Sequence, residues 1–336
     1  MWLGNAAALL AERMNIMDVP GSAPHKQHAR PTPLAGGFLM FATLVLMAVI
    51  YRDQLNRELL FILIGSLVIF LFGVWDDAKG LSAGPKLIGQ LIASVILIAG
   101  GVQVRFVGVL FGADGLSPLA GQTLNIFVTL FWLIGITNAM NMIDSMDGIV
   151  AGLGAIITIF FVGATRLASQ PDLSLWAASL FGLSLGLYFW NGLAKKFFLG
   201  DSGAQTLGFL LASLGILYNP LNRNPESSWI IPIMLLGVPI FDTTLVVMSR
   251  FRRKQPIGTG RRDHTYHRLI ALGMQPSYAV AIVHLMALTI GGLAFFTFYL
   301  RAWLALIFFV ASIIGGLIFL FWLERRPTLD DQSEGK

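Results

Sequence analysis

The chain of 336 residues contains no cysteine and unusually little charge. Without cysteine it can form no disulfide, and thiolate catalysis and cysteine-ligated metal sites are excluded. Charged residues make up 12% of the chain, about half the share usual for soluble domains, whereas hydrophobic residues make up 56%. So few charges cannot cover the surface of a soluble fold of this length. The lipid bilayer must therefore be the solvent for most of the chain.

What the chain does contain is a series of long, unbroken apolar runs. Backbone polar groups in lipid must pair internally, which allows helices or a closed barrel, and barrel strands would appear as short alternating segments. We therefore predict an all-α, polytopic membrane bundle of about ten transmembrane helices, folded as a single domain over residues 1–336. The predicted spans are 34–51, 59–74, 87–104, 124–140, 149–166, 173–190, 204–218, 229–249, 276–299 and 302–323.

The two ends of the chain fall outside these spans. Residues 1–17 begin with an apolar stretch that is too short to cross a bilayer, so we expect either a truncated first helix or an interfacial segment. Residues 324–336 are expected to form a tail on the same membrane face as the basic loop at 250–275.

The loops between the spans alternate between two faces, and these faces differ in basic charge. One face holds 16 Lys and Arg residues, with seven of them in residues 250–275, and the other holds six. Loops on the cytoplasmic side carry the excess of Lys and Arg, so the first face is predicted to be cytoplasmic in a multi-pass protein of the inner (plasma) membrane. Binding of anionic lipid headgroups is the alternative interpretation of the basic residues 252–254.

Acidic and amide side chains recur on that same face, at the ends of spans. An ionised carboxylate at membrane depth costs about 2.5 to 3.5 kcal/mol or more. A cluster of them therefore needs compensation, which a divalent cation together with phosphate groups would supply. The pattern predicts phosphate chemistry on one face of the membrane. The residues are Asp18, Asp76, Asp77, Asn138, Asn141, Asp144, Asp147, Asp201 and Asp263.

Two adjacent carboxylates, Asp76 and Asp77, follow the second predicted span. They repel each other unless a cation lies nearby, and Lys79 or Lys86 is a candidate for that cation. Mg²⁺ prefers one or two carboxylates plus substrate phosphate oxygens, so the pair is a candidate metal site. Alternatively, one carboxylate is a base that deprotonates a phosphate nucleophile. A solvated turn without function is the structural alternative.

Polar residues also recur at every third position from Asn138 to Asp147. On a helix each neighbouring pair would share a face, and the stripe would drift by about 60° per step. We therefore expect it to wind from one flank of a pocket to the other, with Gly148 relaxing the backbone.

The seventh span opens with Gly200, Asp201 and Ser202. Ser202 is expected to cap this helix, whose first N–H groups would be open to an anion. Asp201 beside such an anion would be a good metal ligand, and an ordinary capped turn is the alternative.

The basic loop offers further phosphate ligands, because Arg forms bidentate pairs with phosphate oxygens and His can donate to them. Its spacing is not that of His-Glu-x-x-His, which argues against a zinc protease. The alternative is a purely structural loop. The candidates here are His264, His267 and Arg268.

These four segments, preceded by Pro-Thr-Pro-Leu-Ala-Gly-Gly at 31–37, resemble the polyprenyl-phosphate N-acetylhexosamine-1-phosphate transferases. This glycosyltransferase 4-type family is related to phospho-N-acetylmuramoyl-pentapeptide transferase. The resemblance implies transfer of a sugar-1-phosphate from a UDP-sugar to undecaprenyl phosphate, with release of UMP and with Mg²⁺ as cofactor, for which Mn²⁺ is the substitute. Such a reaction initiates a lipid-linked cell-envelope glycan, for example in lipopolysaccharide or teichoic acid biosynthesis.

Residues 31–37 and the histidine loop look most like the N-acetylglucosamine-type transferases, so UDP-N-acetylglucosamine is the expected donor. UDP-N-acetylmuramoyl-pentapeptide and other N-acetylhexosamine donors stay open. No nucleic acid is expected as a partner, and a homodimer is left open.

The resemblance also implies roles for individual residues. Asp76, Asp77 and Asp201 would be catalytic, and Asp201 and Asn141 would bind Mg²⁺. Tyr266 is a departure, since the family often has a histidine there, and it leaves open which histidine meets the donor diphosphate. The implied substrate-binding residues are Lys86, Asn138, Asp144, Asp147, His264, His267, Arg268, Lys26 and His28.

Two other functions fit the sequence less well. The residues from Asp144 to Ala151 resemble the start of the CDP-alcohol phosphotransferase signature, but the Arg, Gly and Asp positions that complete it are not matched. A polytopic secondary transporter would bind its substrate near the bilayer midplane, often between two related halves. This chain instead has its acids at span ends and shows no internal repeat.

Overall fold

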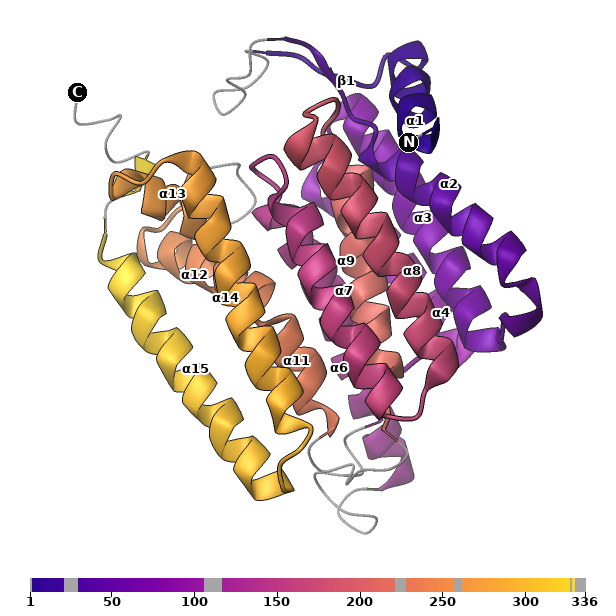
Figure 1. The fold of residues 1–336 in the computed structure, drawn as a ribbon, viewed down its shortest axis with the longest axis vertical. Coiled ribbons are helices and arrows are strands. Elements are labelled where there is room, and N and C mark those ends of the chain that lie inside the picture. Colours follow the sequence, from indigo (N-terminus) through magenta and orange to yellow (C-terminus); the bar gives the residue numbers. More distant parts are fainter. Residues whose placement is uncertain are drawn as a thin grey trace.

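Long helices run up and down through the molecule and place their ends at two opposite faces (Figure 1). The computed structural model describes residues 2–20, 30–105, 117–220, 228–256, 262–326 and 328–329. The α-helices are α1 (Trp2–Arg13), α2 (Gly36–Ile50), α3 (Arg57–Lys79), α4 (Ala83–Gly100), α6 (Pro118–Ile143), α7 (Ile149–Leu167), α8 (Pro171–Leu187), α9 (Gly200–Leu217), α11 (Ile230–Leu235), α12 (Gly237–Arg252), α13 (Thr265–Ala271), α14 (Pro276–Thr297) and α15 (Ala302–Glu324).

Short elements complete the fold. A 3₁₀ helix, η1 (Arg52–Gln54), follows α2, and a π-helix, η2 (Tyr188–Leu193), continues α8. Two strands, β1 (Met17–Asp18) and β2 (Thr32–Pro33), form an antiparallel ladder. The predicted all-α membrane bundle is therefore confirmed, with this small ladder as an addition.

Local sequence signals set the helix ends. The Asn56 side chain accepts a hydrogen bond of 2.8 Å from the Leu59 N–H and so caps the start of α3. Proline occupies the first turn of α6, α8 and α14, where its missing N–H costs nothing. Gly80 ends α3 in the left-handed conformation, with φ 65°.

Each predicted span overlaps a helix, but the count of ten spans is not confirmed. Among the described residues, seven helices are long and apolar enough to cross a membrane: α3, α4, α6, α7, α8 with η2, α14 and α15. Helix α2, with 15 residues, is about 22 Å long, which is less than the roughly 30 Å hydrocarbon core. α1, with 12 residues, is shorter still, so the described part of the N-terminal segment does not form a full span.

The eighth predicted span is broken into α11 and α12, which meet at Leu236. The cause is Pro239, which has no N–H to offer and whose ring would clash with the carbonyl of the residue four positions earlier, Leu235. Leu235 is the last residue of α11. This break places Asp242 in the first half of α12, completely buried.

Helix α9 lies inside the bundle, packed against α2, α3 and α6. Every residue from Ser202 to Gly215 is buried. A helix covered by other helices can carry polar residues such as Gln205 and Thr206 without exposing them to lipid. This explains why α9 is not among the strongly apolar helices.

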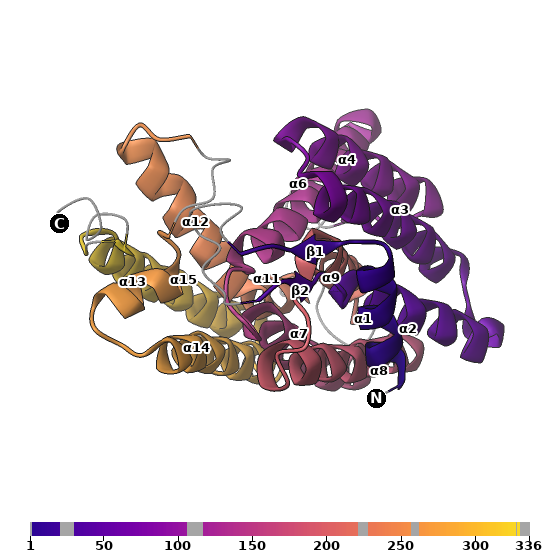
Figure 2. The same cartoon turned by 90° about the horizontal axis from the view of Figure 1, so that it is seen from above.

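The up-and-down path brings the ends of α3, α6 and α12 and the starts of α4, α7 and α9 to one end of the bundle (Figure 1). The β1–β2 ladder lies over this end, as the view from above shows (Figure 2). It is joined to α9 because Leu34 forms a parallel bridge with Phe198, and the Phe198 N–H donates 2.9 Å to the Pro33 carbonyl. All predicted polar segments therefore meet at this end, which we call the active end.

Candidate active site

A lysine joins two carboxylates at the centre of the active end. Lys86, from the first turn of α4, forms ion pairs with Asp76 of α3 and with Asp201 of α9, the latter at 2.8 Å between Nζ and Oδ2. Asn141, in the last turn of α6, lies within hydrogen-bonding reach of Asp201. Four helices thus contribute one polar side chain each to a single cluster.

Asp77 has a different set of partners from its neighbour. Its Oδ1 accepts 2.6 Å from the Asp201 N–H, and its Oδ2 accepts 3.1 Å from the Ser202 N–H and 2.5 Å from the Ser202 hydroxyl. The start of α9 was expected to be open to an anion, with Ser202 as its cap. That expectation was wrong, because the Asp77 carboxylate already occupies this position. Asp77 therefore holds Asp201 in place.

This contact requires helices α3 and α9 to approach very closely. Gly73 permits it, since a Cβ atom there would lie 2.3 Å from the Ser202 Cα. Gly200 permits the turn into α9, with φ 70°, and a Cβ there would lie 2.7 Å from the Asp77 carboxylate. The two glycines thus serve the geometry of the carboxylate cluster.

A buried amide network lies below the cluster. The Gln90 amide donates 3.0 Å to Gln205 and 3.2 Å to Asn138, and Asn138 donates 2.7 Å back to Gln90. Gln90 and Gln205 are almost fully buried. Asn138, predicted to bind substrate, is in contact with this network and with the Ile134 carbonyl at 2.8 Å, which fixes its side chain.

The polar stripe from Asn138 to Asp147 is helical only in its first part. Helix α6 ends at Ile143, and Asp144 has non-helical dihedral angles of φ −77° and ψ 67°. The predicted continuous helical stripe is therefore wrong for Asp144 and Asp147, which lie in a turn. Gly148 closes the turn with φ 79°, and its N–H donates 2.7 Å to Asn191 of the π-helix η2.

Asp144 and Asp147 differ in their electrostatic surroundings. Burial raises the pKa of Asp144 well above its ordinary value, and the carboxylates of Asp201 and Asp77 raise it further. Asp147 lies 3.7 Å from Lys195, measured between Oδ2 and Nζ. The turn therefore extends the excess of negative charge at the active end.

The basic loop packs against that turn. The Tyr266 hydroxyl donates 2.9 Å to the Ser145 carbonyl and lies 2.6 Å from His267 Nε2. Because a carbonyl can only accept, the tyrosine proton points to Ser145, and His267 Nε2 must donate to the tyrosine oxygen. Burial, together with the nearby His264, lowers the pKa of His267 to about 3. His267 is therefore a neutral ring, held in place by Tyr266.

Two carboxylates hold the start of this loop. Asp263 accepts two hydrogen bonds of 2.8 Å from the Arg250 guanidinium. Burial alone would raise the pKa of Asp263, but Arg250 holds it below the usual range. Asp242 accepts 2.7 Å from the Thr265 N–H through Oδ1, and its Oδ2 lies 2.7 Å from His264 Nδ1.

Arg268 has partners other than those predicted. It is fully buried, and its guanidinium donates to Ser249 at 2.7 Å and to the carbonyls of Leu323 and Glu324 at 3.0 and 3.3 Å. It thus binds the last turn of α15, where carbonyls have no helical partner. The prediction that it contacts a diphosphate receives no support from this geometry.

Some polar residues of the site were not predicted from the sequence. Gln90, Gln205 and Asn191 carry no charge and lie inside or directly beside apolar runs, so no local signal marks them. Asp242 did carry a signal, because an ionisable residue inside a predicted span is a functional candidate by default. The predicted substrate-binding residues Lys26 and His28 lie outside the described residues.

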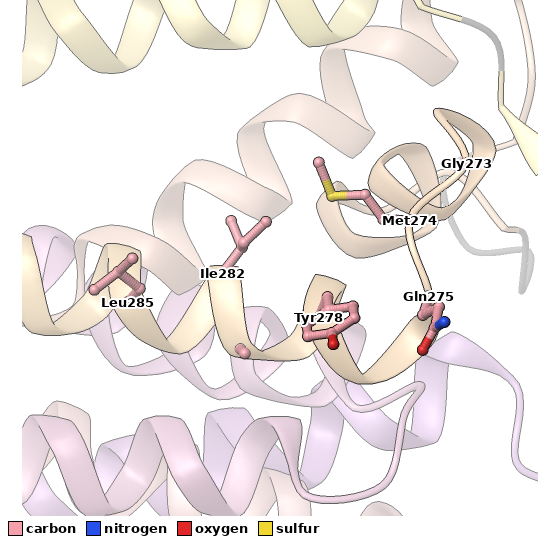
Figure 3. Close-up of a pocket in the computed structure, with 7 residues that line it drawn as sticks. Gly273, Met274, Gln275, Tyr278, Ile282 and Leu285 are labelled. Atoms are coloured by element: carbon pink, nitrogen blue, oxygen red, sulfur yellow. The ribbon is translucent and has the colours of Figure 1, made fainter.

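A separate groove of about 570 Å³ follows the start of α14 (Figure 3). Tyr278, Ile282 and Leu285 project from successive turns of that helix, and Met274 and Gln275, which also line the groove, come just before it. The lining is almost entirely apolar, and it includes none of the carboxylates above. It therefore offers no charged group for phosphate, and we place the candidate site at the carboxylate cluster.

The described residues contain no group of three or more His, Cys, Asp or Glu side chains arranged to hold a metal ion. Mg²⁺ does not require one, since it is usually bound by one or two carboxylates with water and substrate phosphates. Asp201, Asp76 and Asn141 offer an oxygen-rich set at one place, and Lys86 shows that this place already attracts a cation. The residues present therefore fit Mg²⁺ or Mn²⁺.

Comparison with known proteins identifies the family to which the chain belongs. Residues 59–219, which contain Asp76, Asp77, Lys86, Asn141 and Asp201, match the model of glycosyl transferase family 4. A probable undecaprenyl-phosphate N-acetylglucosaminyl 1-phosphate transferase from Bacillus subtilis is 31% identical over 82% of this chain and 76% of its own length.

Two further relatives match over almost the whole chain. A decaprenyl-phosphate N-acetylglucosaminephosphotransferase from Mycobacterium tuberculosis is 29% identical over 95% of this chain and 85% of its own length. An undecaprenyl-phosphate alpha-N-acetylglucosaminyl 1-phosphate transferase from Escherichia coli is 23% identical over 95% and 88%. The chain therefore belongs to glycosyl transferase family 4 and is a membrane phosphoglycosyltransferase.

Proposed function

We propose that the chain transfers N-acetylglucosamine-1-phosphate from UDP-N-acetylglucosamine to undecaprenyl phosphate and releases UMP. The observation that carries this proposal is the cluster of Asp76, Asp201, Asn141 and Lys86 at the active end. The names of the relatives support the polyprenyl phosphate acceptor and the N-acetylglucosamine group. The UDP donor follows from the family resemblance, and UDP-N-acetylmuramoyl-pentapeptide is the alternative donor.

In the proposed reaction, an oxygen of the acceptor phosphate attacks the sugar-proximal phosphorus of the donor. The bond from that phosphorus to the bridging oxygen breaks, and UMP leaves with the electron pair. Both reactants are polyanions, so their approach requires positive charge. Lys86 supplies one such charge, and its pairing with two carboxylates fixes its position between α3 and α9.

Asp201 and Asn141, with Asp76, would hold the divalent cation, which when bound neutralises phosphate charge and stabilises the leaving group. Asp77 positions Asp201 through the start of α9. Asp144 and Asp147, in the turn against the basic loop, would bind the nucleotide sugar, as the family resemblance implies. We further propose that the active end lies at the cytoplasmic face of the inner membrane, as the distribution of Lys and Arg predicts.

The test is UMP release by the purified protein in detergent, with undecaprenyl phosphate, Mg²⁺ and a panel of UDP-sugars. Release should require both the lipid and the metal, should be fastest with UDP-N-acetylglucosamine, and should fall about 100- to 1,000-fold in Asp201→Ala. Asp172→Ala, in the first turn of α8 at the opposite end of the bundle, is the matched control and should keep wild-type activity.

Two results would contradict the proposal. Retained activity in Asp201→Ala would remove this cluster from the reaction. A phosphoryl-enzyme trapped on an aspartate would replace direct attack with a two-step route.

A further inference from the structure

Asp242 has no part in the reaction described so far, although a completely buried carboxylate inside a helix bundle is costly unless its partners compensate for it. Both of its carboxylate oxygens have a hydrogen-bond partner. Oδ1 accepts from the Thr265 N–H and Oδ2 contacts His264 Nδ1, each at 2.7 Å. These partners lie 22 and 23 positions away in the sequence, in the loop that packs on the 144–148 turn.

The contact determines which ring nitrogen of His264 carries a proton. A carboxylate can only accept, so His264 Nδ1 is the protonated nitrogen. His264 is 95% buried, and among the described residues no hydrogen bond or ion pair engages its Nε2. Nε2 is therefore the nitrogen available to a ligand, and a second proton there gives an imidazolium whose charge Asp242 balances.

The ring is also held in orientation. Asp242 binds the backbone of Thr265 and the side chain of His264 at once, so the first turn of α13 and the imidazole are fixed relative to α12. The neighbouring loop histidine, His267, has a different partner, because its Nε2 donates to the Tyr266 oxygen. Of the two loop imidazoles, only that of His264 is thus prepared to act as a cationic donor.

We propose that Asp242 is a positioning residue of the transferase: it fixes His264 with Nδ1 protonated and stabilises an imidazolium that donates from Nε2 to the diphosphate of the nucleotide sugar. This inference rests on the proposed function for its substrate. For metal-binding histidines, removal of the carboxylate that fixes tautomer and orientation typically changes affinity or activity by about 10- to 100-fold, and we expect an effect of the same order here.

Asp242→Asn is the informative substitution. The amide oxygen can still accept from the Thr265 N–H, whereas the amide NH₂ now faces His264 Nδ1. Two facing donors repel, so the ring should move its proton to Nε2 and resist becoming an imidazolium. We expect kcat/KM for the donor to fall about 10- to 100-fold. A merely structural role would lower stability and leave kcat/KM of the folded protein unchanged.

A double-mutant comparison separates these roles further. If Asp242 acts through His264, Asp242→Asn should cause no additional loss of activity in a His264→Ala background. Glu324→Gln is the matched control, because Glu324 is also a buried carboxylate beside this loop but pairs with Arg252. Its effect should be the same with and without the imidazole of His264.

The tautomer can be read directly by nitrogen NMR of the protein labelled at histidine, which has only five such residues. In the wild type, the His264 signals, assigned by their loss in His264→Ala, should show a protonated Nδ1, and UDP should shift them toward imidazolium. In Asp242→Asn they should show a protonated Nε2.

A wild-type His264 protonated only on Nε2 would overturn the proposal, as would activity losses that add in the double mutant. A wild-type enzyme that releases no UMP would instead overturn the proposed function. The NMR measurement would then still decide whether the pair of Asp242 and His264 exists.

Discussion

The two charged regions of the active end differ in how completely their charges are matched. In the carboxylate cluster, Asp76 and Asp201 share the single cation Lys86, and the pKa of Asp144 is raised by its burial and by the further negative charge around it. Around the basic loop, by contrast, three buried carboxylates each have a partner of their own: Asp263 pairs with Arg250, Asp242 of α12 with His264, and Glu324 of α15 with Arg252.

This difference indicates that the carboxylate cluster serves the reaction, whereas the charged pairs around the basic loop serve the fold. A region with surplus negative charge is stabilised by a cation and so is suited to a metal and the phosphates that accompany it. A region with matched, buried pairs gains little from a further ion, but it fixes a loop in one conformation. The sign and number of charged residues in a segment therefore say less about its function than the partners that the fold supplies.

The largest expected loss of stability concerns the basic loop, where the buried charges are paired. Replacing Arg268 by Ala removes the guanidinium from the carbonyls at the end of α15 and leaves buried acceptors without a partner. We expect the free energy of unfolding to fall by about 3 kcal/mol, as measured by chemical denaturation in detergent. KM for the donor in the protein that remains folded should be unchanged.

Arg325→Ala is the control for this measurement, because Arg325 lies at the same helix end but is exposed. It should change stability by less than about 0.5 kcal/mol. If Arg268→Ala raised KM for the donor and left stability intact, Arg268 would be a substrate ligand after all, and the contrast between the two regions would weaken.

A smaller loss of stability is expected when Asp77 is replaced. Asp77 lies in the carboxylate cluster, but its partners are those of a helix cap. Asp77→Ala should destabilise the protein by about 1 to 2 kcal/mol, because the first N–H groups of α9 lose their acceptor. Thermal unfolding would measure this. Asp53→Ala, which removes a carboxylate that is 84% exposed, should have almost no effect.

Activity of Asp77→Ala should also fall, since Asp201 loses its support. The diagnostic measurement is the Mg²⁺ dependence: if Asp77 only positions Asp201, raising the Mg²⁺ concentration should restore part of the activity. Loss of activity with unchanged stability and no response to Mg²⁺ would assign Asp77 directly to the reaction.

Local pattern in the sequence predicted a large part of this fold. Apolar runs of helical length located the helices, and the polar residues at their ends pointed to one active face. What it could not predict were pairings across long distances in the chain. Asp77 meets Ser202, which is 125 positions away, and nothing near either residue indicates that contact. Asp76 and Asp77 look alike in the sequence, yet helix geometry turns them toward different partners.

Sequence patterns also gave wrong predictions of where helices end. The apolar run that locates α3 stops at Val74, but the helix continues to Lys79 because Gly80, not the loss of hydrophobicity, ends it. The three-residue spacing from Asn138 to Asp147 suggested one helix, whereas α6 ends at Ile143. Periodicity says which face a residue would take if the helix continued, but not whether it continues.

At neutral pH the smallest effect concerns His267, whose pKa is lowered to about 3 by burial and by His264. In the unfolded chain this ring would take up a proton near pH 6.5. Between about pH 6.5 and pH 3 the unfolded state therefore binds a proton that the folded state does not, so the folded state loses stability as the pH falls through that range. The contribution is about 1.4 kcal/mol per pH unit, and it is absent above pH 6.5.

His267→Gln removes this titrating group, while the amide nitrogen at the position of Nε2 can still donate to Tyr266. We expect the unfolding free energy of the variant to depend less steeply on pH between pH 6.5 and pH 5 than that of the wild type, with similar stability at pH 7.5. Denaturation curves at several pH values measure the difference in slope. Equal slopes would mean that His267 takes up its proton in the folded state, and then the loop would carry an unmatched charge like the carboxylate cluster.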